Sequence, residues 1–287
     1  MSEVNEEYFE GYLRANNLDP FEVYDEGDRR LSEKIEILKA NPDIKFADFG
    51  TRRHFSLRWH KHVLDRLKTE VPNNFLGTSN VEMSNGLGMK PIGTFAHEMP
   101  MVYAGLADAR GENIRASHNK FLQAWFARYG KEGSTALTDT FGTEFFFEDF
   151  TVEQAREWNG LRHDSGDPFE FGEKAIAYYE QNGVDPTTKT IVFSDGLDIN
   201  QIVEIKNYFG DRVNVVFGWG TTLTNDLGIK ALNVVMKATH VLDVEAQVEA
   251  DTVKLSDNKG KHTGPLAKVV LYQTVEFAPT REKVGVA

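Results

Sequence analysis

Short apolar runs followed by polar or glycine-containing loops recur along this chain, and a helical pattern follows most of them. Residues 190–193, for example, are rich in β-branched side chains, end in Ser194-Asp195-Gly196 and precede a helical pattern over 199–208. Such alternation is typical of βαβ units, and no dipeptide of hairpin type joins neighbouring runs. It predicts an α/β fold with a parallel sheet, either a (β/α) barrel or a large doubly wound sheet.

The same periodicities place the other elements and the domain boundaries. We expect an acidic helical leader over 1–40, an α/β barrel domain over 41–245 and a C-terminal extension over 246–287 that packs on the barrel. Residues 254–261 are typical of an exposed turn. Further strands are predicted at 44–49, 75–80, 91–95, 135–138, 213–217 and 232–236, and helices at 56–67, 113–129, 143–158 and 169–179.

Composition excludes several classes of function. The formal net charge of -12 argues against a grip on the nucleic-acid backbone, which needs a basic face. The chain has no cysteine, which removes disulfides, thiolate nucleophiles and cysteine-bound zinc and suits a reducing compartment. The first residues lack a signal-like pattern and no later stretch is apolar enough to span a bilayer. We therefore expect a cytoplasmic protein without a membrane or nucleic-acid partner.

Residues 160–168, Gly-Leu-Arg-His-Asp-Ser-Gly-Asp-Pro, carry the densest set of polar groups at a predicted strand end. Arg162 and Asp164 alternate with apolar or aromatic neighbours, so in a continuing strand they project to the same side. That spacing suits one polyoxygenated ligand. The alternative is a strand-end salt bridge followed by a turn.

Other strand ends offer anion-binding and acidic groups. Gly218-Trp219-Gly220-Thr221 has two glycines that allow close approach to the backbone and a hydroxyl donor, which suits a phosphate, although the same pattern occurs in plain tight turns. Asp195 can hold a sugar hydroxyl or Mg²⁺. Asp198 is most simply a helix N-cap.

Three groups nearer the N-terminus need a partner or a ligand. Asp48 lies between apolar residues and must meet a partner if it is buried. Adjacent Arg52 and Arg53 can grip a carboxylate or phosphate, or form a solvated pair. His97 follows a predicted strand, where an isolated histidine is most often only hydrogen-bonded. His60 and His62, two apart on a helix, are expected on the surface.

Several familiar sites are absent from the sequence. It has no His-Glu-x-x-His or paired Cys/His spacing for zinc and no Gly-x-Ser-x-Gly elbow. It also lacks the P-loop and the Rossmann glycine pattern.

Taken together, the strand-end motifs resemble the nicotinate phosphoribosyltransferase family. The resemblance covers most of the chain. It rests on 48–56 (Asp-Phe-Gly-Thr-Arg-Arg-His-Phe-Ser), 77–80 (Gly-Thr-Ser-Asn), 93–98 (Gly-Thr-Phe-Ala-His-Glu), 136–140 (Ala-Leu-Thr-Asp-Thr), 160–168, 193–198 (Phe-Ser-Asp-Gly-Leu-Asp), 218–221, 232–237 and 254–257 (Lys-Leu-Ser-Asp).

The resemblance implies an irregular (β/α) barrel of the type II phosphoribosyltransferases, which join nicotinate to phosphoribosyl pyrophosphate in NAD salvage. It implies that His97 is phosphorylated by ATP, that Arg162 grips base or phosphate, and that Asp164 and Asp195 orient the ribose or bind Mg²⁺. Arg52 and Arg53 would face the nicotinate carboxylate or phosphate. The further substrate-binding residues expected from the family motifs are Asp48, Thr78, Ser165, Gly196, Gly218, Gly220 and Thr221.

One departure concerns the N-terminus. The family's early Asp-x-Tyr-Lys segment is missing from this sequence, so we expect a fragment, a split enzyme or a shortened member, acting as a homodimer or with a separate N-terminal partner chain. Two alternatives stay open: a nicotinamide phosphoribosyltransferase, and a non-catalytic partner subunit. The double arginine at 52–53 favours the acid substrate, because the nicotinamide enzymes resemble Asp-Phe-Gly-x-Arg-Gly there.

Overall fold

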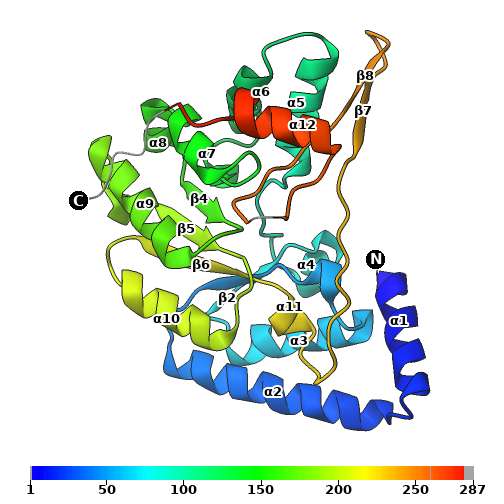
Figure 1. The fold of residues 1–287 in the computed structure, drawn as a ribbon. Helices are drawn as coiled ribbons and strands as arrows, with labels where there is room; N and C mark the ends of the chain where they lie inside the picture. Colours follow the sequence, from blue (N-terminus) through cyan, green and yellow to red (C-terminus); the bar gives the residue numbers. More distant parts are fainter. Residues whose placement is uncertain (1, 259, 281–287) are drawn as a thin grey trace. The chain divides into compact units, whose positions relative to one another are not determined.

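A computed structural model describes residues 2–258 and 260–280. Strands β1 to β6 form a six-stranded sheet in the order β2-β1-β6-β5-β4-β3 (Figure 1). β1 pairs parallel with both β2 and β6, and β3 pairs parallel with β4. The predicted α/β class with a parallel sheet is confirmed, whereas closure into a barrel stays a prediction. The six strands are β1 (Phe46–Asp48), β2 (Phe75–Thr78), β3 (Thr135–Leu137), β4 (Gly160–His163), β5 (Thr190–Phe193) and β6 (Asn214–Trp219).

The chain divides into two compact units. The first comprises the described residues up to Gly93 together with Val192–Gly210 and Val215–Val235; the second comprises Thr94–Ile191, Asp211–Asn214 and the described residues from Met236 on. The division predicted from the sequence, at residues 40 and 245, stays a prediction.

Helices of the first unit begin where polar side chains cap them. Ser56 accepts from the N–H of Trp59, and Asp198 forms a capping box with Gln201, which confirms the N-cap predicted there. Phe46 packs against Phe75 and Trp219 across the neighbouring strands, with ring centroids 5.7 and 5.5 Å away. The helices of this unit are α1 (Ser2–Ala15), α2 (Pro20–Ala40), α3 (Leu57–Glu70), α4 (Val81–Leu87), α10 (Ile199–Phe209) and α11 (Thr221–Thr224), with the 3-10 turn η1 (Thr51–Arg53).

Polar side chains also cap helices of the second unit. One helix predicted from the sequence pattern is in fact two helices. The helix predicted over 143–158 is wrong as a single element, because Phe150 is extended and Thr151 caps a new helix with a capping box to Gln154. The helices are α5 (Glu98–Ala109), α6 (Ile114–Tyr129), α7 (Thr143–Asp149), α8 (Val152–Glu157), α9 (Pro168–Gln181) and α12 (Leu266–Leu271), with the short turns η2 (Lys131–Gly133), η3 (Pro186–Thr188) and η4 (Tyr272–Glu276).

Two predicted strands are not strands. Residues 91–95 begin with a proline that has no N–H, and the N–H of Ile92 bonds to the carbonyl of Thr78 without a ladder following. Residues 232–236 leave Val235 and Met236 exposed. Apolar runs without a neighbouring strand to bond to therefore stay irregular.

The sequence also predicts no hairpin, and this is wrong for β7 (His240–Asp243) and β8 (Val248–Asp251), which pair antiparallel. Their connection is four residues long rather than a two-residue turn. The Asp243 carboxylate accepts the N–H groups of Glu245 and Ala246, and Gln247 adopts a φ of 55°. Figure 1 shows this pair as the orange strands beside α5.

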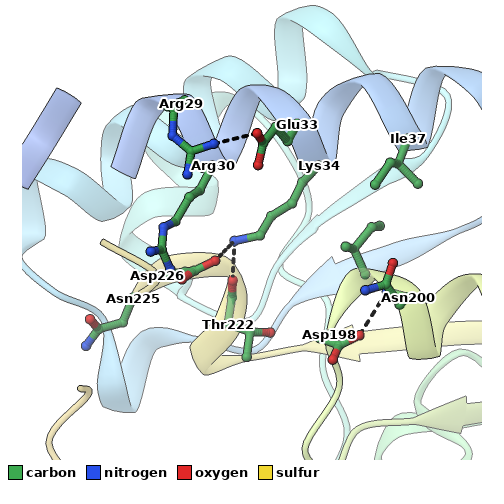
Figure 2. Close-up of a pocket in the computed structure, with 11 residues that line it drawn as sticks. Arg29, Arg30, Glu33, Lys34, Ile37, Asp198, Asn200, Thr222, Asn225 and Asp226 are labelled. Carbon is green, nitrogen blue, oxygen red and sulfur yellow. Dashed lines mark hydrogen bonds and ion pairs between the residues drawn. The ribbon is translucent and has the colours of Figure 1, made fainter. Parts of the chain in front are cut away.

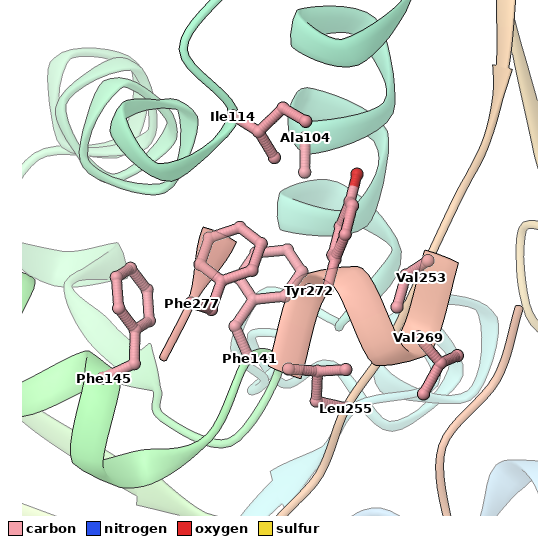
Figure 3. Close-up of a cluster of buried hydrophobic side chains, with 9 residues drawn as sticks. All are labelled: Ala104, Ile114, Phe141, Phe145, Val253, Leu255, Val269, Tyr272 and Phe277. Atoms are coloured by element: carbon pink, nitrogen blue, oxygen red, sulfur yellow. The ribbon is translucent and has the colours of Figure 1, made fainter. Parts of the chain in front are cut away.

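A buried apolar cluster holds the last described segment in the second unit (Figure 3). The rings of Phe141 and Phe277 stack with centroids 3.9 Å apart, and Tyr272 lies 5.2 Å from Phe277. The cluster is completed by Ala104, Ile114, Phe145, Val253, Leu255 and Val269. The buried residues of this segment thus belong to the core of this unit, and the Leu255 N–H bonds to the Thr140 carbonyl in the loop after β3.

Candidate active site

His97 is the centre of the densest polar group in the second unit. It lies directly before α5, buried, with Nε2 3.0 Å from Asp164 Oδ2 and 3.7 Å from Asp139 Oδ1. Its Nδ1 lies 3.0 Å from the Thr140 hydroxyl. Both ring nitrogens are therefore engaged, one with carboxylates and the other with a hydroxyl.

Arg162 and Asp164 project to the same side, as the strand alternation predicted. Arg162 donates from Nη2 to Asp164 Oδ1 at 2.9 Å and from Nη1 to the Thr94 hydroxyl at 2.9 Å. Because Asp164 uses its other oxygen for His97, one carboxylate joins the guanidinium to the imidazole. Removing its charge would disturb both partners.

Burial lowers the pKa of His97 below its usual value, and the bond to Asp164 and the charge of Asp139 oppose this shift without cancelling it. The imidazole is therefore neutral at pH 7. The carboxylate at Nε2 requires a donor there, so the neutral ring carries its proton on Nε2 and accepts at Nδ1 from Thr140. The lone pair of this neutral ring is therefore on Nδ1, where the Thr140 hydroxyl donates to it.

Asp139 is a functional candidate that no pattern around the single residue indicates. It is fully buried, and its Oδ2 accepts from the Ser165 hydroxyl at 2.7 Å. Lys254 Nζ lies 3.3 Å from the same oxygen. Residues 254–261 were expected to form an exposed turn, which is wrong at their start, since Lys254 is only 7% exposed.

The segment beginning at Lys254 is fixed to the loops of this group by further bonds. The Leu255 N–H donates to the Thr140 carbonyl, and the Asp257 carboxylate accepts the N–H and hydroxyl of Thr143. Burial raises the pKa of Asp257, although the bonds from Thr143 work against that shift. The sequence signal that could have indicated this contact is that segments 136–140 and 254–257 are both motifs of the family that the chain resembles.

A cation could be held here. One nitrogen of His97 and one oxygen each of Asp139 and Asp164 lie within 4.8 Å of one another. Two carboxylates and an imidazole are a donor set that divalent cations accept. Lys254 already balances part of the charge of Asp139.

In the first unit, Asp48 is the corresponding buried centre. It is 0% exposed and accepts three bonds: from the Gly50 N–H at 2.7 Å, the Thr78 hydroxyl at 2.6 Å and His60 Nε2 at 2.7 Å. The expectation that a buried Asp48 needs a partner is confirmed. The surface location expected for His60 is wrong, because it is 0% exposed; His62 is exposed and pairs with Asp28.

The turn η1 that carries Arg52 and Arg53 begins three residues after Asp48 and is bonded to the segment after β6. Asn225 donates to the Arg53 carbonyl at 2.7 Å, and the Phe55 N–H donates to the Thr224 carbonyl at 3.1 Å. Arg53 donates to Asn233. Within the described part of the chain, the Arg52 guanidinium has no hydrogen bond or ion pair and is exposed. The Arg52 guanidinium can therefore bind an anion from outside the chain.

The glycines predicted to bind phosphate differ in their surroundings. A Cβ at Gly218 would lie 2.5 Å from the Phe49 ring, so this glycine makes room for a side chain of its own unit. Gly220 has only the Phe49 carbonyl nearby, at 3.8 Å, and Thr221 begins α11. Gly196 has a φ of 63° and follows the half-buried Asp195. Phosphate binding by these loops stays a prediction.

A pocket of about 440 Å³ lies between α2 and the segment 222–226 of the same unit (Figure 2). Lys34 crosses it and donates to the Thr222 carbonyl at 2.6 Å and to Asp226 at 2.7 Å. Arg30 donates to the other Asp226 oxygen at 2.7 Å. Burial alone would raise the pKa of Asp226, but the bonds from Lys34 and Arg30 outweigh it and hold the pKa below the ordinary value.

This ion pair predicts a pH-dependent stability. Asp226→Asn is expected to lower the melting temperature at pH 7 by about 2–4 °C, corresponding to about 1 kcal/mol for a partly exposed pair. Because the folded pKa lies below 3.8, the contribution is complete above that pH and is lost as the pH falls through the folded pKa. The difference from wild type should therefore shrink in acid. Asp43→Asn, in an exposed pair with Lys206, is the control; a pH-independent deficit in Asp226→Asn would contradict the linkage.

Of the residues predicted to form the site, His97, Arg162, Asp164 and Ser165 lie together around Asp139. In the first unit, Asp48 and Thr78 share a hydrogen bond, and the Arg52–Arg53 turn follows directly. Asp195, Gly196, Gly218, Gly220 and Thr221 follow β5 or lie at the end of β6. The fold and the site define a parallel α/β protein with its ionisable groups at and after strand ends.

Comparisons then identify the particular family. Residues 44–278 match the sequence profile of the nicotinate phosphoribosyltransferase (NAPRTase) family, and the chain belongs to that family. It is similar to the nicotinate phosphoribosyltransferases of Acinetobacter baumannii and Chromobacterium violaceum, at 41% identity over 266 residues and 40% over 267, in each case over 90% of this chain and 62% of the relative. The chain thus spans about three fifths of the length of these relatives.

Solved structures of nicotinate phosphoribosyltransferases are also similar to this chain. The nicotinate phosphoribosyltransferase of Porphyromonas gingivalis superposes with a TM-score of 0.83 at 34% identity, over 91% of this chain and 66% of that one. The protein of the same name from Vibrio cholerae gives 0.80 at 32%, over 94% and 64%. Among the described residues, no helix has the length and apolar character needed to cross a bilayer.

Proposed function

We propose that this chain forms nicotinate mononucleotide and pyrophosphate from nicotinate and phosphoribosyl pyrophosphate, a step of NAD biosynthesis. The observation that carries the proposal is a buried, neutral His97 held by Asp164 beside Arg162, in a chain of the nicotinate phosphoribosyltransferase family. A cytoplasmic location, which the lack of cysteine suits, belongs to the same proposal.

In the reaction the bond between ribose C1 and the pyrophosphate oxygen breaks, and its electron pair leaves with pyrophosphate. The lone pair of the pyridine nitrogen then forms the new C1–N bond. The sugar is cationic in the transition state and the leaving group is anionic, so fixed cations and carboxylates lower the barrier. Arg162 would stabilise phosphate or base, and Asp164 and Asp195 would orient the ribose.

Anion binding is assigned to the loops of the first unit. Arg52, whose guanidinium is exposed, would bind the nicotinate carboxylate or a phosphate, with Arg53 beside it. Thr78, Gly196, Gly218, Gly220 and Thr221 are assigned to the sugar and its 5′-phosphate, and Ser165 to the substrate through its place next to Asp139.

Coupling to ATP is proposed at His97. A neutral imidazole can attack the terminal phosphorus of ATP; the bond from phosphorus to the bridging oxygen of ADP breaks, and the ring proton passes to Asp164, its hydrogen-bond partner. Water later releases the phosphoryl group as phosphate and restores the ring.

Mg²⁺ is the metal implied by the family, and the carboxylates present fit it. Asp164 and Asp195 are the ligands that the family motifs imply. In the second unit, one ligand atom each of Asp164, Asp139 and His97 lie within 4.8 Å of one another. When bound, the ion would neutralise phosphate charge. The proposal also includes assembly as a homodimer or with a separate N-terminal partner chain.

The experiment is a product assay with nicotinate, phosphoribosyl pyrophosphate, Mg²⁺ and ATP. We expect nicotinate mononucleotide, pyrophosphate and acid-labile phosphate on His97, and no acid-labile phosphate in His97→Gln. Nicotinamide is assayed in competition, and preference for the amide would identify the alternative substrate. Absence of product from this chain, both alone and with a separate N-terminal partner chain added, would refute catalysis. If such an inactive chain stimulates a full-length family member, it is a regulatory subunit.

A further inference from the structure

Asp48 has no room for a substrate. Its carboxylate is 0% exposed, and three donors already occupy it: the Gly50 N–H on Oδ1, and the Thr78 hydroxyl and His60 Nε2 on Oδ2. A carboxylate with all three of these bonds fixes part of its own chain.

Through its bond to the Gly50 N–H, Asp48 holds the start of η1. Gly50 is the residue before η1, and its carbonyl in turn accepts the N–H of Arg53, so Asp48 fixes the first peptide of the turn that carries both arginines. A Cβ at Gly50 would lie 2.2 Å from the Thr224 hydroxyl, so the turn fits closely against the next segment and has little freedom to shift. The position of the arginines therefore depends on this carboxylate.

His60 is the part of this arrangement that comes from a distant element. It projects from α3, is 0% exposed, and stacks on the buried His54 ring at 5.1 Å between centroids. Its Nδ1 has no hydrogen bond among the described residues, so its single polar contact there is Asp48. A histidine kept in the core for one bond to one carboxylate has a positioning role.

We propose that His60, through Asp48, is a positioning residue for the Arg52–Arg53 turn and sets the affinity of that turn for an anionic substrate group, a carboxylate or a phosphate. The affinity part rests on the proposed function, because it assumes that Arg52 binds substrate. The positioning part stands on the hydrogen bonds alone.

Two variants of His60 and their counterparts at His62 test the positioning part. His60→Leu removes the donor, whereas His60→Gln places an amide N–H near the position of Nε2. Amide hydrogen exchange at residues 50–53 is expected to speed up at least about tenfold in His60→Leu and to return toward wild type in His60→Gln, since local opening rates follow local stability. His62→Leu and His62→Gln, on the same helix, should leave it unchanged. Unchanged exchange in His60→Leu overturns the proposal.

Kinetics test the affinity part. In His60→Leu the KM for the substrate bound by Arg52 should rise about tenfold with kcat much less affected, as expected when a binding group is misplaced. In an Arg52→Ala background the same substitution should add no further increase, because the group it positions is gone. Equal effects in both backgrounds overturn the proposal.

The experiments distinguish failure of the positioning role of His60 from failure of the proposed substrate binding by Arg52. Faster exchange with a wild-type KM in both His60→Leu and Arg52→Ala supports positioning of the turn and refutes the role of Arg52 in substrate binding. If His60→Leu does not fold, Thr78→Val removes a different donor from the same Asp48 oxygen, and its exchange at residues 50–53 must rise for the proposal to stand.

Discussion

In the proposed reaction, replacement of Asp164 with asparagine is expected to lower kcat/KM for nicotinate mononucleotide formation by about 10²–10³-fold, the size typical of a lost charge-stabilising group. Asp164 uses one oxygen for Arg162 and the other for His97. Asparagine has the same shape but one acceptor oxygen and no charge, so it cannot hold both partners or take the proton of the ring. The measurement is steady-state kinetics beside a melting curve.

Asp167→Asn is the matched control, three residues further on. Asp167 caps α9 by accepting from the N–H groups of Phe169 and Glu170, a role that asparagine also fills. Its activity and melting temperature should stay near those of wild type. Equal activity in Asp164→Asn and Asp167→Asn would show that Asp164 only forms a structural salt bridge at the strand end, the alternative function of the Arg-x-Asp pattern.

The largest effect on stability is expected for Gly160→Ala. An added Cβ would lie 1.8 Å from the Thr190 carbonyl oxygen and 2.8 Å from its carbon, and backbone atoms in a sheet cannot turn away as a side chain can. We expect a loss of about 3–5 kcal/mol, or about 10 °C in melting temperature, which is at the upper end for overpacking. Thermal unfolding followed by circular dichroism measures it.

Gly11→Ala serves as the comparison for that substitution. Gly11 lies within α1 and nothing comes within 4 Å of the added Cβ, so alanine should stabilise the helix by about 0.5–1 kcal/mol. A Gly160→Ala protein that melts within about 2 °C of wild type would mean that β4 shifts away from Thr190 at little cost, contrary to the tight packing expected of a core.

The elements that the sequence predicted well are those with a local cause. Period-2 and period-3.6 patterns located β1 to β6 and most helices, and strand alternation placed Arg162 and Asp164 on one side. The start of the helix after β5 was predicted correctly because its signal is local: the N-cap Asp198 and its capping-box partner Gln201 lie within four residues of sequence. These features need no knowledge of distant contacts.

Features that depend on distant segments were missed. His60 shares a helical face with Val63, Leu64 and Leu67, all buried, and that spacing could have revealed its burial; its partner Asp48 could not have been read from α3 alone. The contact of Lys254 with Asp139 joins residues more than 100 positions apart, and no local pattern indicates it. The strands predicted at 91–95 and 232–236 were wrong because these segments have a strand-like composition but no neighbouring strand to pair with.

The contact between Lys254 and Asp139 also bears on how the protein is made. Synthesis proceeds from the N-terminus, so His97, Asp139 and Asp164 leave the ribosome long before the lysine that balances the buried carboxylate. Until that residue emerges, the nascent second unit carries an acidic interior with one counter-ion too few. The second unit can therefore complete this ion pair only after residue 254 has been synthesised, and a chain released before that residue would lack the charge that balances Asp139.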